Sequence, residues 1–172
     1  EMCIRDRQYT FRNAESFNQP LNSWNVSKVK YMISMFHDAS AFNQDLNNWD
    51  VSSVENMNNM FRSTTSFNKN INNWDVSNLK TAHAMFLGSN FNQPLNNWNV
   101  SSITNISNMF HAASAFNQNI GNWDVSNVEN MNEMFRGAGS FNQPLNNWDV
   151  SSVKIMYGMF WGAGSFNQPL NN

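Results

Sequence analysis

Apolar residues recur along this chain in a pattern that repeats every 25 residues. The dipeptide Phe-Asn occurs at positions 17, 42, 67, 91, 116, 141 and 166, so one interval is 24 residues and the other five are 25. One unit reads F-N-Q-P-L-N-N-W-D-V-S-S-V-x-N-M-x-x-M-F-x-x-A-x-S. The chain is therefore a repeat protein, and stacking of its units would align equivalent residues in columns.

The second half of each unit predicts a short amphipathic helix. Its apolar positions follow the spacing i, i+3, i+6, i+7, as in Val29, Met32, Met35 and Phe36. Two units carry a capping-box sequence, at residues 52–55 and 126–129. Glycine follows the Met-Phe pair by two residues in three units, where a helix would end: Gly88, Gly137 and Gly162.

The first half of each unit predicts a short extended segment, as in Phe17–Val26. Trp24 and Val26 are two residues apart, as on one side of a strand, and Asn-Asn before Trp in most units is typical of a turn. We predict an α/β repeat solenoid of about 6–7 coils, open at both ends, with a short parallel strand and a short helix in each coil. An all-β solenoid is the alternative.

This repeat unit resembles the 25–26-residue repeat of bacterial surface lipoproteins, a family related to the BspA-like leucine-rich-repeat proteins. The resemblance covers residues 8–172. It implies a leucine-rich-repeat-like, right-handed solenoid that acts in adhesion or host interaction. The resemblance also implies an extracellular or cell-surface location, although the chain shows no signal peptide, lipobox or wall anchor.

The repeat pattern also divides the chain. Residues 1–7 match nothing downstream, and we predict that they are a foreign or disordered leader outside the fold. Residues 8–172 form a single predicted domain. Both ends interrupt a unit in its middle, so we expect this domain to be part of a longer array, or its ends to be covered by another copy.

Composition and charge exclude several classes of function. Ten basic and 12 acidic residues give a net charge of −2, and no basic run is present, which disfavours nucleic acid as a partner. No apolar run is long enough to insert into a membrane. Cys3 is the single cysteine, so an intrachain disulfide and a thiolate metal cluster are excluded.

The sequence offers no motif for catalysis or for binding a cofactor. A phosphate-binding loop, a dinucleotide-binding glycine pattern and a Ser/His/Asp grouping are all missing, so we expect neither an enzyme nor a cofactor or metal. One polar column leaves an alternative open. Its members either accept N–H groups at the helix start or bind Ca²⁺: Asn25, Asp50, Asp75, Asn99, Asp124 and Asp149.

Three columns are expected to be structural. Six Trp residues share one position, where they either fill the interior or form an exposed strip for sugars, and the surrounding apolar positions favour the interior. The Met column is typical of core filler rather than a Cu(I) site. The Asn that follows each Phe predicts an asparagine ladder, in which the side-chain amides bond to one another and to turn carbonyls.

Two further columns vary in size, charge and polarity from unit to unit, which predicts exposed helix positions. We expect them to form a surface that contacts a protein or another cell-surface ligand. The first column contains Ile33, Asn58, His83, Ser107, Asn132 and Tyr157, and the second contains His37, Arg62, Leu87, His111, Arg136 and Trp161. The favoured function is a non-enzymatic module for protein binding or adhesion. The alternatives are a structural element that stacks end to end into fibres or arrays and, less favoured, a lectin using the Trp column.

Overall fold

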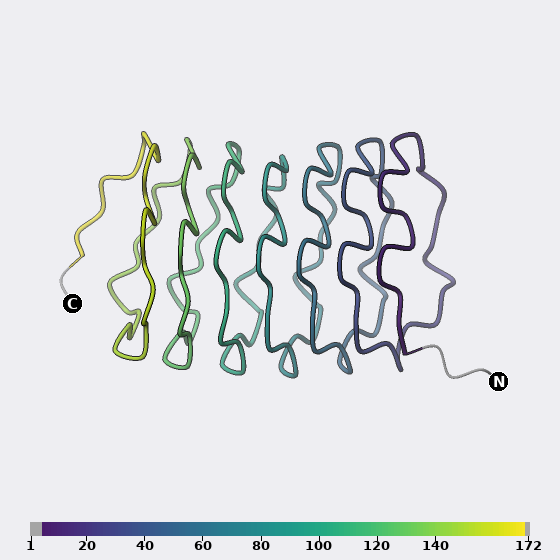
Figure 1. Cartoon of the computed structure of the whole chain (residues 1–172), viewed down its shortest axis with the longest axis horizontal. Helices are drawn as coiled ribbons and strands as arrows, with labels where there is room; N and C mark the ends of the chain where they lie inside the picture. The colour runs from purple at the N-terminus through teal and green to yellow at the C-terminus, as the bar shows by residue number, and fades with distance from the viewer. Residues whose placement is uncertain (1–4, 171–172) are drawn as a thin grey trace.

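The structure of the protein is a computed structural model that describes residues 5–170. The chain winds into successive coils that stack along one axis, with the two ends of the chain at opposite ends of the stack (Figure 1). Isolated parallel bridges join each coil to the next through one residue per coil. These residues are Asp6, Tyr31, Asn56, Thr81, Asn105, Asn130 and Ile155.

The predicted α/β solenoid is wrong, and nothing in the fold supports a leucine-rich-repeat-like architecture. Within residues 5–170 there is no helix and no strand longer than an isolated bridge. The bridges lie in the half of the unit that was predicted to be helical, whereas the predicted strand at 17–26 forms none. The all-β alternative is not met either, because the bridges do not extend into continuous strands.

Overlapping turns replace the predicted helix. We call residues 31–38 and their equivalents the turn segments; the equivalents are 6–13, 56–63, 81–88, 105–112, 130–137 and 155–162. In one such segment the N–H groups of Met35 and His37 donate to carbonyls three residues earlier, at 3.3 Å. The N–H groups of Ser34 and Phe36 instead donate to the next coil, at 2.8 and 2.9 Å. Donors therefore alternate between their own coil and the neighbouring coil, which no helix allows.

Two residues in every turn segment adopt a left-handed backbone conformation, which breaks any helix. Ser34 and Asp38 have φ of 53° and 60°. Gly88, Gly137 and Gly162 occupy the second of these positions, so the glycines mark a left-handed turn and not a helix end. The apolar stripe at i, i+3 arises because each turn also spans three residues. A helix of about eight residues is marginal by itself, whereas the stacked turns satisfy N–H groups across coils.

The predicted capping boxes are also absent. The N–H and hydroxyl of Ser52 bond to Asp50 Oδ1, and Glu55 forms an ion pair with Lys30 of the preceding coil. Ser126 bonds to Asp124 in the same way. These are Asx turns, in which the carboxylate satisfies a local N–H without any helix to cap.

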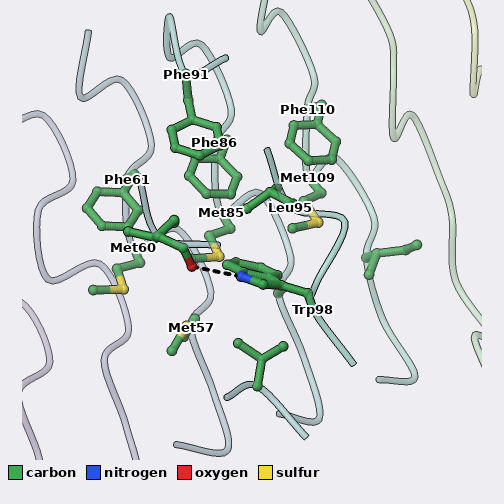
Figure 2. Packing of buried hydrophobic residues seen from close by; sticks show 14 of the residues in the cluster. Met57, Met60, Phe61, Met85, Phe86, Phe91, Leu95, Trp98, Met109 and Phe110 are labelled. Carbon is green, nitrogen blue, oxygen red and sulfur yellow. Dashed lines mark hydrogen bonds between the residues drawn. The ribbon is translucent and has the colours of Figure 1, made fainter. Parts of the chain in front are cut away.

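The core is a set of aromatic and aliphatic columns that runs the length of the stack. Phe36 stacks on Phe61 at 5.6 Å between coils and on Phe42 at 4.1 Å within its coil. Figure 2 shows Met85 and Trp98 in this core, together with the rings of Phe61 and Phe86. The burial of this repeated set confirms the predicted interior role of the Met column.

Residues 5–7 belong to the stack, since Asp6 bridges to Tyr31 and the N–H of Arg7 donates to the Tyr31 carbonyl at 3.0 Å. The rest of the predicted leader, residues 1–4 including Cys3, lies outside the described residues.

Candidate functional site

The two variable columns lie side by side on the turn segments, and their backbone makes the contacts between coils. The carbonyls of Asn58 and Arg62 accept N–H groups from Ser34 and Asp38 of the preceding coil, at 2.8 and 3.0 Å. The same pair of bonds recurs at each later step of the stack. Because the backbone alone forms these bonds, the side chains of both columns are free to differ.

The exposure of these side chains is graded. Tyr157 and Trp161 are the most exposed, at 67% and 59%. His37 and Ser107 are buried, so the prediction that every member is exposed is wrong for these two. The other members are partly exposed: Ile33, Asn58, Arg62, Leu87, His83, His111, Asn132 and Arg136.

The first column contains a chain of polar contacts over three coils. Asn58 Oδ1 accepts the N–H of His83 at 2.9 Å. His83 Nδ1 lies 2.7 Å from the hydroxyl of Ser107, which in turn donates to Asn105 Oδ1 at 2.7 Å. These contacts hold the imidazole in place and present a fixed polar surface.

The second column carries cations and aromatic rings. Arg136 donates to Glu133 at 2.6 Å, and its guanidinium lies 4.1 Å from the ring centroid of Trp161. Arg12 lies over the Tyr9 ring at 5.6 Å. Arg62 has no ion pair or side-chain hydrogen bond within residues 5–170, so its guanidinium is available to a partner.

All three histidines on this surface favour the neutral form. Burial is the main cause that lowers the pKa of His37, His83 and His111, and the charge of Arg62 lowers each of them further. The carboxylates of Asp38 and Glu133 oppose this shift at His37 and His111, respectively.

The turn segments also hold surface residues that the sequence analysis missed. Tyr9 and Tyr31 are 51% and 38% exposed, and Arg12 precedes His37 in the second column. Continuing the repeat backward from Phe11 would have placed Arg12 in the second column and Tyr9 at the turn position equivalent to Ser34. With them, the turn segments contain all three tyrosines and all three histidines of the chain. We call the outward side of the turn segments, with both variable columns, the turn face.

The Trp column lies in the interior, as predicted. Trp24 is partly exposed and packs against the core. The other five members are only 2–3% exposed: Trp49, Trp74, Trp98, Trp123 and Trp148. The indole N–H of each of these five donates to a backbone carbonyl of the preceding coil, as from Trp98 to Ile71 at 3.0 Å (Figure 2). A sugar-binding strip on this column is therefore wrong.

The asparagine ladder is present, with different partners from those predicted. Asn92 Oδ1 accepts the backbone N–H of Asn117 at 3.0 Å and the side-chain amide of Gln118 at 2.9 Å. The ladder runs through every described coil, from Asn18 to Asn167. Side chains of asparagine thus do here what backbone carbonyls do on the turn face.

The Asn/Asp column forms Asx turns. Asp124 Oδ1 accepts the hydroxyl and N–H of Ser126 at 2.6 and 3.1 Å. These bonds, the hydroxyl first, lower the pKa of Asp124, and the corresponding serines do the same for Asp75 and Asp149. Within residues 5–170 no three His, Cys, Asp or Glu side chains lie close enough together to hold a metal ion.

Comparison with known proteins places the chain in a repeat family. Residues 2–93 and 85–172 each match the family described as Mycoplasma protein of unknown function, DUF285. The match fits a repeat family in general and does not support the leucine-rich-repeat surface proteins in particular. No curated protein matches the chain. No helix in residues 5–170 is long and apolar enough to cross a membrane. Because the two tandem matches together span nearly the whole chain, it belongs to the DUF285 family.

Proposed function

We propose that this chain is a non-enzymatic module that binds a protein partner through its turn face. One observation carries the proposal. The side chains that vary between coils, together with all tyrosines and histidines, gather where backbone hydrogen bonds join each coil to the next. The surface can therefore change without cost to the stack, as a recognition surface requires.

The composition of the turn face supports a protein partner. Tyr, Trp and Arg are the residue types that dominate binding energy in protein interfaces. Trp161 and Tyr157 present large exposed rings, and Arg136 stacks on Trp161 at 4.1 Å. An aromatic ring held by a neighbouring guanidinium loses less conformational freedom on binding than a free one.

The resemblance to bacterial surface lipoproteins supports placing this partner outside the cell. In this proposal the chain acts in adhesion at the cell surface, and the relation to BspA-like proteins is part of the proposal.

The test is an array of secreted and cell-surface proteins probed with the labelled chain. We expect at least one array protein to bind, and we expect Trp161→Ala to weaken that binding about 30-fold, as for an interface hot spot. The matched control is Lys69→Ala, an exposed residue in a 68–75 segment away from the turn face. Binding that survives Trp161→Ala and Tyr157→Ala together, with the fold intact, would refute the turn face as the site.

A second candidate function is end-to-end association of two copies of the chain. Met156 is 40% exposed and Leu170 is 58% exposed, whereas the equivalent Met131 and Leu145 are buried under the following coil. A second copy that continues the stack would cover these side chains. Light scattering tests this idea, because the mean mass would rise with protein concentration, whereas a constant monomer mass would exclude it.

A further inference from the structure

A hollow lies on the side of the stack formed by the asparagine ladder, which we call the amide face. The face consists of residues 18–25 and their equivalents, 43–50, 68–75, 92–99, 117–124 and 142–149. The hollow has a volume of about 490 Å³ and spans three successive coils. This volume lies in the range of small-molecule sites. It is separate from the turn face.

One glycine, Gly121, lies in the wall of this hollow. Gly121 stands where the neighbouring coils carry Asn72, Asn96 and Asn146. Two coils earlier, the side chain of Asn72 reaches the next coil, since its amide donates to Asn96 at 3.3 Å and its Oδ1 accepts the N–H of Asn97 at 3.0 Å. Gly121 has no side chain to make this crossing, so the equivalent N–H of Asn147 in the next coil receives no such bond.

The backbone around Gly121 leaves no room for a side chain. A Cβ atom at this position would lie 2.6 Å from the carbonyl oxygen of Pro144, closer than real contacts allow. Gly121 is buried, and its N–H donates to Asn119 Oδ1 at 3.0 Å. Glycine is thus required by the close approach of the Pro144 backbone, and both residues lie in the wall of the hollow.

The wall of the hollow offers uncharged hydrogen-bonding groups. The backbone N–H groups of Asn122 and Asn147 have no acceptor within residues 5–170. The side chains of Asn146 and Asn147 also make no hydrogen bond with any described residue. Pro94 and Pro144 add aliphatic surface on either side, and no acidic or basic residue lines the space.

We propose that this hollow binds a neutral sugar ring. Amide groups donate and accept side by side, which matches the adjacent hydroxyl groups of a pyranose. The aliphatic proline rings suit the C–H faces of the sugar, and the absence of charge in the lining disfavours ionic ligands. This site is independent of the buried Trp column and does not depend on the proposed protein-binding role.

The proposal is tested by titrating ¹⁵N-labelled protein separately with glucose, galactose, mannose and N-acetylglucosamine. We expect at least one sugar to shift the backbone amide signals of Asn122 and Asn147 in a saturable manner. The backbone amide of Asn97 serves as an internal control, because its N–H already donates to Asn72 Oδ1. We expect its chemical shift to stay unchanged.

Two variants complete the test. Asn146→Ala removes one amide of the hollow and should weaken binding up to about tenfold. Asn47→Ala changes the equivalent residue in a remote coil and should leave binding unchanged. Gly121 itself is left intact, because any side chain there would collide with Pro144. The proposal is overturned if none of the four sugars gives a saturable shift, or if Asn47→Ala weakens binding as much as Asn146→Ala.

Discussion

The turn face and the amide face belong to the same coils but join them in different ways. On the turn face, backbone N–H groups donate directly to backbone carbonyls of the next coil, as from Phe36 to Met60 at 2.9 Å. On the amide face, side chains supply one partner of each bond, as when Asn18 Oδ1 accepts the N–H of Asn43 at 2.9 Å. Trp49 likewise uses its indole to reach the carbonyl of Leu21 at 3.0 Å.

This difference explains which positions repeat faithfully and which vary. A bond between two backbone groups forms with almost any side chain, so the turn face accommodates Ile33, His83 and Tyr157 at one position. A bond that needs the side-chain oxygen of asparagine requires an asparagine in every coil, and asparagine does follow Phe in all seven units. Positions that vary between repeat units therefore mark the surface whose side chains are not needed to hold the coils together, and which can serve in recognition.

The largest expected effect comes from breaking one rung of the amide face. Asn92→Ala removes the acceptor for the N–H of Asn117 and for the amide of Gln118, so we expect the free energy of unfolding to fall by about 1–3 kcal/mol. Asn132→Ala, the same substitution on the turn face, is expected to change it by less than about 0.5 kcal/mol. Urea unfolding measures both. Equal losses would contradict the contrast between the two faces.

A smaller effect is expected at the left-handed positions that shape the turn face. Gly137 has φ of 68°, and a Cβ there would meet only ordinary contacts, the nearest at 3.7 Å from Ala112. Gly137→Ala should therefore lower the free energy of unfolding by about 1 kcal/mol through backbone strain alone. Ala112 has φ of 54°, so Ala112→Gly is expected to raise it by about 1 kcal/mol. Thermal unfolding of both variants tests this prediction. Shifts of the two melting temperatures in the same direction would argue against the left-handed turn geometry.

The smallest expected effect is a pH dependence carried by the turn face. The pKa values of His37, His83 and His111 are lowered in the folded state, mainly by burial, from an ordinary value of 6.5. The unfolded chain therefore binds more protons just below pH 6.5, and stability that is complete above this value falls as the pH decreases through it.

Urea unfolding of the parent and of His83→Asn between pH 7 and pH 5 tests this prediction. The variant should lose less stability than the parent over this range. The amide face should contribute only at lower pH, because its Asp75 and Asp124 have pKa values below their ordinary 3.8. A parent protein whose stability is constant between pH 7 and pH 5 would contradict the prediction.

Much of the core was predictable from the repeat, because a residue type kept at one position in every unit has the same environment in every coil. The interior Trp and Met columns and the asparagine ladder follow from this reasoning. Ion pairs follow the same rule, since Lys30 pairs with Glu55 and Lys154 pairs with Glu129, each at one shared position of neighbouring coils. Gly121 could also be noticed in the sequence as an exception to its column, but the hollow beside it could not be predicted.

The predicted helix failed for a physical reason. A turn of three residues and a helix of 3.6 residues per turn place apolar side chains at nearly the same spacing, so Val29, Met32 and Met35 fit both. The distinguishing signal was weak, because Ser34 and Ala84 adopt the left-handed conformation without being glycine.

The sequence by itself determined the 25-residue unit, the residues of each column, and which positions keep one residue type in every unit and which vary. Only the tertiary structure decided where the backbone N–H groups find their acceptors. That choice depends on the neighbouring coil, which supplies carbonyls at the right distance to one half of the unit and leaves the other half to asparagine and tryptophan side chains.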